Sequence, residues 1–243
     1  MNEITGKVSA QYNKAEYYLQ LKRTNDSLVQ ANQRLYNKLK IDFDLPDTTS
    51  KIVLDTIRID SLTQYRKFNY LESKVVYNSV TLQSNYIELG RGANAGIKKE
   101  MGVVDVTNCV VGIVTDVSDK YAVVMSLLNK DSKISAQLKK AKDVGTITWD
   151  GKEPNLLQLT GIRKSAKIAK GDSIVTSGYT PTFPYGQLIG RVEEIITDKS
   201  TNNLTINVRS AANFYNLQFV YALEDLKRDE INKLLDKVKK QDQ

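Results

Sequence analysis

The strongest constraint on the fold is a pattern of alternating apolar and polar residues that runs from Lys74 to Leu223. Short segments rich in Val, Ile and Tyr recur there, such as GVVDV, CVVGIVTDV and LTINVRS, and turns of Gly, Asn, Asp and Lys separate them. Alternation with period two is typical of half-buried β-strands, and about a dozen short strands at a spacing of roughly 8 to 12 residues are typical of barrels or sandwiches. The pattern therefore predicts a mostly β fold and argues against alternating strands and helices.

An internal similarity indicates that this β region contains two related units. The stretch Ala95-x-Ile97-x-Lys99-x-x-x-Val103-Val104 matches Ala166-x-Ile168-x-Lys170-x-x-x-Ile174-Val175, and an apolar strand with an internal glycine, Gly112 or Gly190, follows each copy. A glycine inside a strand marks a place where a barrel strand bends. We therefore expect two small β-barrels, at residues 74–150 and 151–223, with exchange of strands between them left open. Chance similarity among Val-rich strands is the alternative.

A helical segment precedes the β region. Leu21, Leu28 and Leu35 are seven residues apart, and no glycine or proline interrupts residues 15–39. Leu at the d positions of a heptad repeat with Asn at a positions favours a parallel two-stranded coiled coil. The sequence thus predicts that residues 1–40 dimerise through Tyr18, Leu21, Asn25, Leu28, Asn32, Leu35 and Leu39. The alternative is an amphipathic helix that packs on its own domain, with Val29 and Tyr36 widening its apolar face.

The segments on either side of the β region give weaker signals. Residues 41–73 are expected to form a connector, because Pro46 stops the helix and the stretch IVLDTIRIDSL alternates only weakly. The polar residues 224–243 are expected to form a tail that is helical or disordered. No run of about 18 apolar residues is present, so we expect no segment of this sequence to span a bilayer. Two alternatives stay open here: a soluble cytoplasmic protein, or part of a protein whose membrane anchor lies outside this sequence.

The residues Gly171-Asp172-Ser173 raise the question of a nucleophilic serine, at Ser173 or at Ser177. A serine hydroxyl needs an adjacent base, usually histidine, and the chain contains no histidine. A Ser-His-Asp triad is therefore excluded, and the single cysteine is too few for a structural zinc cluster. A Ser-Lys pair with Lys170 is the remaining enzymatic alternative. We predict that the protein is not an enzyme and holds no metal and no cofactor.

The chain is basic, with 35 Lys and Arg against 28 Asp and Glu and a net charge of +7. Its densest basic stretches are residues 139–142 and 227–240. Neither carries the interleaved aromatic residues that stack on bases, so we interpret both as solvated surface and expect no nucleic acid partner.

Three motifs in the β region match one family of bacterial proteins. They are a G-x-x-x-G-I-K turn, a V-V-G-x-V strand, and GD-x-I-x-TSG followed by FP-x-G-x-x-IG. Their residues outside the V-V-G-x-V strand are Gly92, Gly96, Ile97, Lys98, Gly171, Asp172, Thr176, Ser177, Gly178, Phe183, Pro184, Gly186, Ile189 and Gly190. With these motifs, about residues 70–223 resemble MreC, the family of bacterial rod and cell-shape-determining proteins. The order of coiled coil before β domain agrees with that family.

The resemblance implies a fold, a location and a set of partners. The implied fold is a coiled coil followed by two six-stranded barrels that are chymotrypsin-like but non-catalytic. The implied location is the periplasm, with an inner-membrane anchor that this chain does not contain. The implied function is a scaffold of the cell-elongation (rod) complex, which self-associates, binds the elongation-specific penicillin-binding transpeptidase and controls cell shape and peptidoglycan synthesis. MreD, RodA and the MreB system are further implied partners of the full-length protein. A non-catalytic barrel adaptor of another envelope complex is the alternative.

One loop departs from the family pattern. Where many members have Leu-Gly-Gly after Thr-Ser-Gly, this chain has Tyr179-Thr180-Pro181. The candidate partner contacts in this loop are Ser177, Gly178, Tyr179, Phe183, Pro184, Tyr185 and Gly186. Its bulky residues Phe183, Pro184 and Tyr185 are either tucked under a barrel or displayed to a partner, and we expect them to be tucked.

Overall fold

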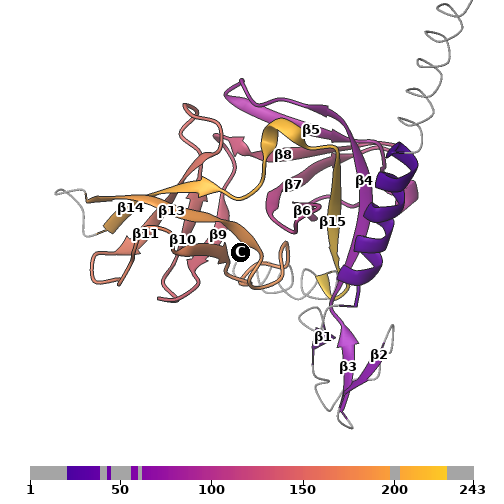
Figure 1. Ribbon diagram of the computed structural model, residues 1–243, viewed down its shortest axis with the longest axis horizontal. Helices are drawn as coiled ribbons and strands as arrows, with labels where there is room; N and C mark the ends of the chain where they lie inside the picture. Colours follow the sequence, from indigo (N-terminus) through magenta and orange to yellow (C-terminus); the bar gives the residue numbers. More distant parts are fainter. Residues whose placement is uncertain (1–20, 39–42, 45–55, 60–61, 198–202, 229–243) are drawn as a thin grey trace, which may run out of the picture.

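The computed structural model describes residues 21–38, 43–44, 56–59, 62–197 and 203–228, and most of its strands form two closed barrels (Figure 1). Around the first barrel the order is β15 (Phe219–Asp225), β4 (Phe68–Asn78), β5 (Ser84–Leu89), β8 (Ala122–Asn129), β7 (Val110–Val117) and β6 (Gly102–Asp105). Around the second it is β10 (Val144–Thr148), β11 (Leu156–Arg163), β14 (Asn203–Ser210), β13 (Leu188–Thr197), β12 (Ser173–Thr176) and β9 (Ile134–Leu138). The prediction of a mostly β chain with two six-stranded barrels is confirmed.

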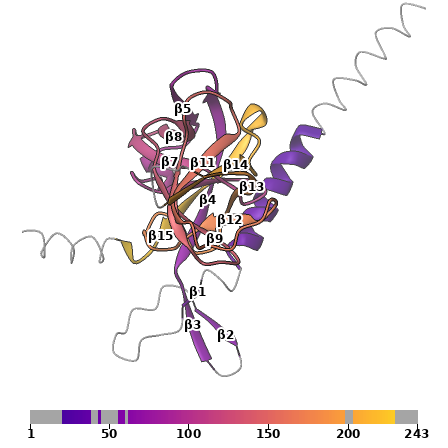
Figure 2. The same cartoon turned by 90° about the vertical axis from the view of Figure 1, so that its left-hand side faces the viewer.

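A helix and a small sheet accompany the barrels. The helix, residues 21–36, lies on the outside of the first barrel beside β4 and β15 (Figures 1 and 2). The small sheet has the order β1 (Phe43–Asp44), β3 (Leu62–Arg66), β2 (Thr56–Ile59) and stands off from both barrels. Two short 3-10 turns, η2 (Ala93–Ala95) and η3 (Phe214–Asn216), complete the described elements. Within the described ranges, no helix is long and apolar enough to span a membrane.

The barrels do not follow the division expected at residue 150. β9 and β10, which precede that residue, belong to the second barrel, and β15 returns to the first after the second is complete. β4 begins at Phe68, inside the segment expected to be a connector, and β15 ends at Asp225, inside the expected tail. The strand pairing therefore shows exchange of strands between the two barrels, which the sequence had left open.

The bends expected at Gly112 and Gly190 occur, one in each barrel. Between β6 and β7 the pairing passes from Val103↔Gly112 to Val104↔Val110, so β7 has one extra residue. Between β12 and β13 it passes from Ile174↔Gly190 to Val175↔Leu188, with one extra residue in β13. A Cβ atom at Gly112 would lie 2.2 Å from the Met125 carbonyl oxygen, and one at Gly190 would lie 2.3 Å from the Arg209 carbonyl oxygen. Glycine is required at both positions because the neighbouring backbone occupies the space of a side chain.

Alternating side chains fill the barrels. In β14, for example, Leu204, Ile206 and Val208 are buried while the residues between them are more exposed. Cys109 is 5% exposed, and it forms an isolated bridge to Leu188 at the start of β13. The two barrels are thus joined at backbone level as well as through side chains.

Candidate interaction surfaces

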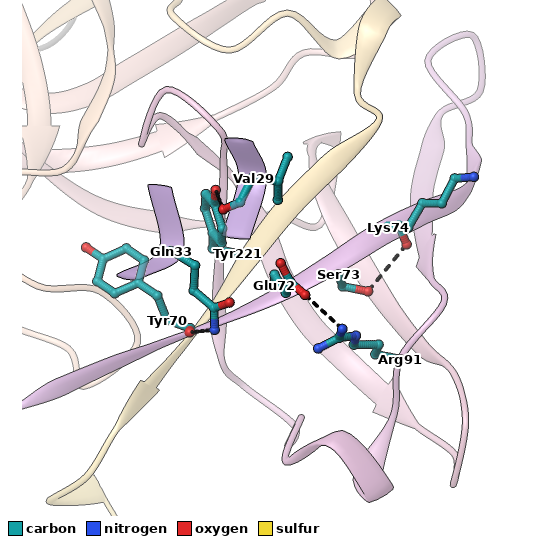
Figure 3. A network of polar contacts seen from close by, with 8 residues as sticks. All are labelled: Val29, Gln33, Tyr70, Glu72, Ser73, Lys74, Arg91 and Tyr221. Carbon is teal, nitrogen blue, oxygen red and sulfur yellow. Dashed lines mark hydrogen bonds and ion pairs between the residues drawn. The ribbon is translucent and has the colours of Figure 1, made fainter. Parts of the chain in front are cut away.

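The helix is fixed to the first barrel by its inner face. Val29 on that face is only 4% exposed, and its carbonyl oxygen accepts a hydrogen bond of 2.9 Å from the Tyr221 hydroxyl on β15 (Figure 3). The Tyr36 hydroxyl, two turns further on, donates to the Val106 carbonyl oxygen at 2.9 Å. These contacts place the helix against the barrel at two points along its length.

The backbone of Tyr70 provides a third attachment point. β5 pairs only with the later half of β4, from Val75 onward, so the earlier half of β4 leaves one edge without a β5 partner. The Gln33 side-chain amide donates to the Tyr70 carbonyl oxygen at 2.7 Å, as Figure 3 shows, and the Asn37 side-chain oxygen accepts from the Tyr70 amide at 2.7 Å. Buried backbone groups need partners, and here the side chains of Gln33 on the helix and Asn37 directly after it supply them in place of a strand.

Three tyrosines pack together beneath the helix. The Tyr36 and Tyr70 rings are stacked with centroids 5.3 Å apart, and Tyr221 meets both of them edge to face. Burial raises the pKa of the Tyr221 hydroxyl, and nearby Tyr36 and Glu72 raise it further. Burial, with Asp105, also raises the pKa of the Tyr36 hydroxyl. Both hydroxyls therefore remain protonated donors at neutral pH.

The leucines of the heptad repeat lie on the outer face of the same helix. Leu21, Leu28 and Leu35 are 53%, 57% and 62% exposed. Asn25 is exposed and Asn32 is half-buried, while Tyr18 and Leu39 lie outside the described residues. Val29 and Tyr36 pack on the helix's own domain, as expected for an amphipathic helix docked on its barrel. The three leucines are not buried in that packing. Dimerisation through this row stays a prediction.

A groove runs between the helix and the barrel next to the leucine row. It has a volume of about 720 Å³, and its lining includes Leu21, Leu28, Val75, Leu217 and Phe219. The rest of the groove is lined by the polar residues Lys22, Thr24, Asn25, Asp26, Lys74 and Gln218. The exposed leucines therefore border a depression of mixed character in the same chain.

The loop from Ser177 to Gly186 is partly tucked and partly displayed. Phe183 is 2% exposed and Pro184 is buried, whereas Tyr179 is 77% and Tyr185 43% exposed. The expectation that the bulky residues are tucked is therefore confirmed for Phe183 and Pro184 and wrong for Tyr185. The Tyr185 hydroxyl accepts a hydrogen bond of 2.5 Å from the Lys142 amine, which holds the pKa of this phenol below its ordinary value.

The buried part of this loop joins the two barrels. Phe183 lies against Gly102 of β6, where an added Cβ would be 2.4 Å from the phenyl ring. The Gln187 side chain donates to the Tyr70 hydroxyl at 3.0 Å, so Tyr70 contacts the helix through its backbone and the second barrel through its side chain. The Thr176 hydroxyl fixes the loop by donating to the Pro184 carbonyl oxygen at 2.6 Å and accepting from the Gln187 amide at 2.9 Å.

The two candidate serines occupy ordinary structural positions. The Ser177 and Ser135 hydroxyl oxygens are 2.8 Å apart, and the Ser173 hydroxyl accepts from Arg191. Asp172 accepts from the Lys140 amine at 2.5 Å and from the Ala169 amide at 3.0 Å, and the Lys140 hydrogen bond is the main reason why the pKa of Asp172 lies below its ordinary value. In the described part of the chain, the side-chain contacts of these two serines are to the Ser135 hydroxyl, the Tyr179 backbone amide and the Arg191 guanidinium, none of which is a general base.

Metal ligands are also sparse. In the same part of the chain, no group of three or more His, Cys, Asp or Glu side chains is placed to hold a metal ion. Burial raises the pKa of the free Cys109 thiol, which makes it a poor nucleophile.

Residue patterns alone did not identify the residues that join the parts of the molecule, namely Gln33, Asn37, Tyr70, Gln187 and Tyr221. The helical spacing of Val29, Gln33 and Tyr36 was the available signal for an inner face. Gln33 and Asn37 are polar, however, and an apolar pattern does not detect side chains that cap a strand edge.

Comparison with known proteins agrees with this geometry. Residues 75–224 match the family model described as rod shape-determining protein MreC, barrel core. The cell shape-determining protein MreC of Listeria monocytogenes is 30% identical over 169 residues, which are 68% of this chain and 57% of that protein. This chain thus spans little more than half the length of that relative.

Solved structures with the same fold include an MreC from Listeria monocytogenes, with a TM-score of 0.60, 24% identity and coverage of 92% of this chain and 95% of that one. Another is a complex between penicillin-binding protein PBP2 and MreC from Helicobacter pylori, with a TM-score of 0.53, 20% identity and coverage of 66% and 99%. At these identities the structures establish the shared fold, and the family model and the Listeria sequence establish the relationship. This chain, with its two exchanged barrels and its docked helix, belongs to the MreC family of cell shape-determining proteins.

Proposed function

We propose that this chain is the periplasmic part of a non-enzymatic scaffold of the bacterial cell-elongation complex. In this proposal it is anchored to the inner membrane in the full-length protein, self-associates through the N-terminal helix, and binds the elongation-specific penicillin-binding transpeptidase. MreD, RodA and the MreB system are its further partners in the full-length protein. Membership of a cell-shape family supports the scaffold, and the complex of a Helicobacter pylori MreC with PBP2 supports the transpeptidase as a partner.

The observation that carries the proposal is the contrast between the two faces of the helix. Its inner face is held on the barrel by Val29 and by the Gln33 and Tyr36 hydrogen bonds, so the helix is already positioned within one chain. Its outer face leaves the three leucines more than half exposed. Leucines seven residues apart on an exposed helix face are what a parallel coiled coil buries, so a second copy is the partner that fits this face.

Replacement of Leu28 by glutamate tests the self-association. Glutamate would place a charge in the dimer seam, where its desolvation is unfavourable, while in the single chain it would simply face water. We expect Leu28→Glu to shift sedimentation at micromolar concentration toward monomer without changing the unfolding transition. Leu82→Glu is the matched control, because Leu82 is 53% exposed in the loop between β4 and β5, away from the helix. Unchanged association of Leu28→Glu would contradict the assigned seam.

The transpeptidase contact is tested on the displayed part of the loop. We expect Tyr179→Ala to weaken binding of the transpeptidase ectodomain from the same organism by roughly tenfold or more, as loss of an aromatic interface anchor does. Tyr215→Ala is the control, since Tyr215 is also an exposed tyrosine, at 63%, but lies in η3. Equal binding by both variants and the parent would remove this loop as the contact and leave the self-association untouched.

A further inference from the structure

The end of the second barrel carries a concentration of positive charge. The turn between β9 and β10, residues 139–143, and the segment between β11 and β12, residues 163–172, together contain seven Lys and Arg and two Asp. All seven of these cationic residues are exposed, and so is Arg191 on neighbouring β13. We call the surface formed by these two segments and Arg191 the basic pole.

Strand pairing brings these distant residues together. β9 pairs with β12 so that Leu138 lies opposite Ile174, and the Lys139 amide donates to the Ser173 carbonyl oxygen at 3.0 Å. β13 pairs with β12 so that Arg191 lies opposite Ser173. The two segments and the β13 residue therefore form one continuous surface, although 52 residues separate Lys139 from Arg191.

Most of the charge on the basic pole is not neutralised. Its two carboxylates are already engaged, Asp172 with Lys140 at 2.5 Å and Asp143 with Arg163 at 2.6 Å. In the described part of the chain, Lys139, Lys164, Lys167 and Lys170 form no ion pair within 4.0 Å. The Arg191 guanidinium donates to the Gly171 carbonyl oxygen and to the Ser173 hydroxyl, both at 3.3 Å. Among the described residues, four lysines and an arginine thus face solvent without an ion pair, although Lys170 lies near enough to Glu193 on β13 to add to the effect of Arg209 in lowering the pKa of that carboxyl.

The kind of residue on the basic pole indicates the kind of ligand. Among the described residues, the exposed large apolar side chains all lie outside residues 139–143 and 163–172. The one exposed ring shown against the basic pole is Tyr185, and it is already engaged by Lys142. Protein interfaces are depleted in lysine and depend on aromatic and apolar anchors, and base recognition needs stacking rings. Lysine amines are strongly hydrated point charges on flexible stems, and several of them spread over one surface suit a chain of repeated anionic groups.

We propose that the basic pole binds a linear polyanion of repeated phosphate groups. The binding is electrostatic and selects charge density along a chain, because each exposed lysine meets a separate phosphate. This site uses neither the helix nor Tyr179, although Lys142 of the basic pole contacts Tyr185 of the same loop. The proposal therefore stands whether or not the helix contacts a second copy or Tyr179 a transpeptidase.

Fluorescence anisotropy of the whole chain with labelled linear polyphosphate, in a salt series, tests the proposal. Counterion release gives a slope of roughly −0.7 in log affinity against log salt for each contacted phosphate on a single-stranded polyanion. We expect Lys164→Glu with Lys167→Glu and Lys170→Glu to weaken binding at least tenfold and to flatten the slope by about 2, which is three lost contacts. The matched control replaces the exposed Lys120, Lys130 and Lys133, which lie outside the basic pole, with glutamate. It lowers the net charge by the same amount and should weaken binding only about twofold. Unfolding transitions of both triple variants are expected to equal that of the parent.

Four outcomes would overturn the proposal. Equal weakening by the control variant would show binding through net charge alone. Competition by inorganic phosphate at equal phosphate concentration would show a small-anion site. Equally tight binding of polyglutamate of the same charge would assign the surface to acidic peptides. If the parent binds anionic vesicles but not polyphosphate, and the basic-pole variant loses the vesicle binding, the basic pole would be assigned to a membrane surface.

Discussion

Replacing Phe183 with alanine should weaken the packing between the two barrels, so that they no longer unfold together. The phenyl ring is 2% exposed and occupies the space beside Gly102, so it belongs to the second barrel in sequence and packs against the first. Truncation of a buried phenylalanine costs about 3 to 5 kcal/mol of unfolding free energy. We expect the lower end, about 3 kcal/mol, because Phe183 lies in a loop that can partly collapse into the space it leaves.

Chemical denaturation followed by two probes measures this effect. Trp149 is the single tryptophan, lies at the end of β10 and is 4% exposed, so its fluorescence reports the second barrel. Far-ultraviolet circular dichroism reports both barrels. In the parent we expect coincident transitions, and in Phe183→Ala a lower midpoint with the two probes separated.

The control for this prediction lies in the same loop. Tyr179 is 77% exposed, and Tyr179→Ala should change the unfolding free energy by no more than about 0.5 kcal/mol. A cost below about 1 kcal/mol for Phe183→Ala, or one equal to that of Tyr179→Ala, would refute the assignment of Phe183 as the joint between the barrels.

Three further predictions follow from single contacts. Tyr221→Phe removes the hydrogen bond to the Val29 carbonyl oxygen and should lower the free energy of unfolding by about 1 kcal/mol, measured by denaturant titration. An unchanged free energy would show that this hydrogen bond does not stabilise the docked helix. Gly102→Ala would place its Cβ 2.4 Å from Phe183 and should lower the free energy of unfolding by roughly 1 to 3 kcal/mol. The loss should be smaller in a Phe183→Ala background, and additive losses for the two substitutions would rule out the clash. The pKa of Asp172 lies below its ordinary value of 3.8, so the folded chain holds this carboxylate ionised more strongly than the unfolded chain does. The stabilisation by this carboxylate is therefore present above about pH 4 and is lost as the pH falls through the folded pKa. Asp172→Asn should reduce the dependence of the unfolding free energy on pH in this range, which parallel pH series of variant and parent would measure.

How far the candidate sites were predictable depends on the kind of signal each residue gives. Leu21, Leu28 and Leu35 were identified from spacing alone, because a heptad repeat is a local pattern, and the structure places all three on one outer face. Phe183 and Tyr185 are both bulky residues of one loop, yet the first is buried and the second is exposed. Sequence could not separate them, because the choice depends on where Gly102, 81 residues earlier, offers a space without a side chain.

By itself the sequence determined the strand-forming segments, the number of barrels and the glycines at which β7 and β13 bend, because alternation and glycine act within a few residues. Only the tertiary structure decided which strand closes which barrel: β9 and β10 join the second, and β15 returns to the first. It also decided that Tyr70 connects the helix, the first barrel and Gln187 of the second. These choices rest on pairing between residues up to about 150 positions apart, such as Tyr70 with Leu223, and local periodicity carries no information about which distant edge a strand will meet.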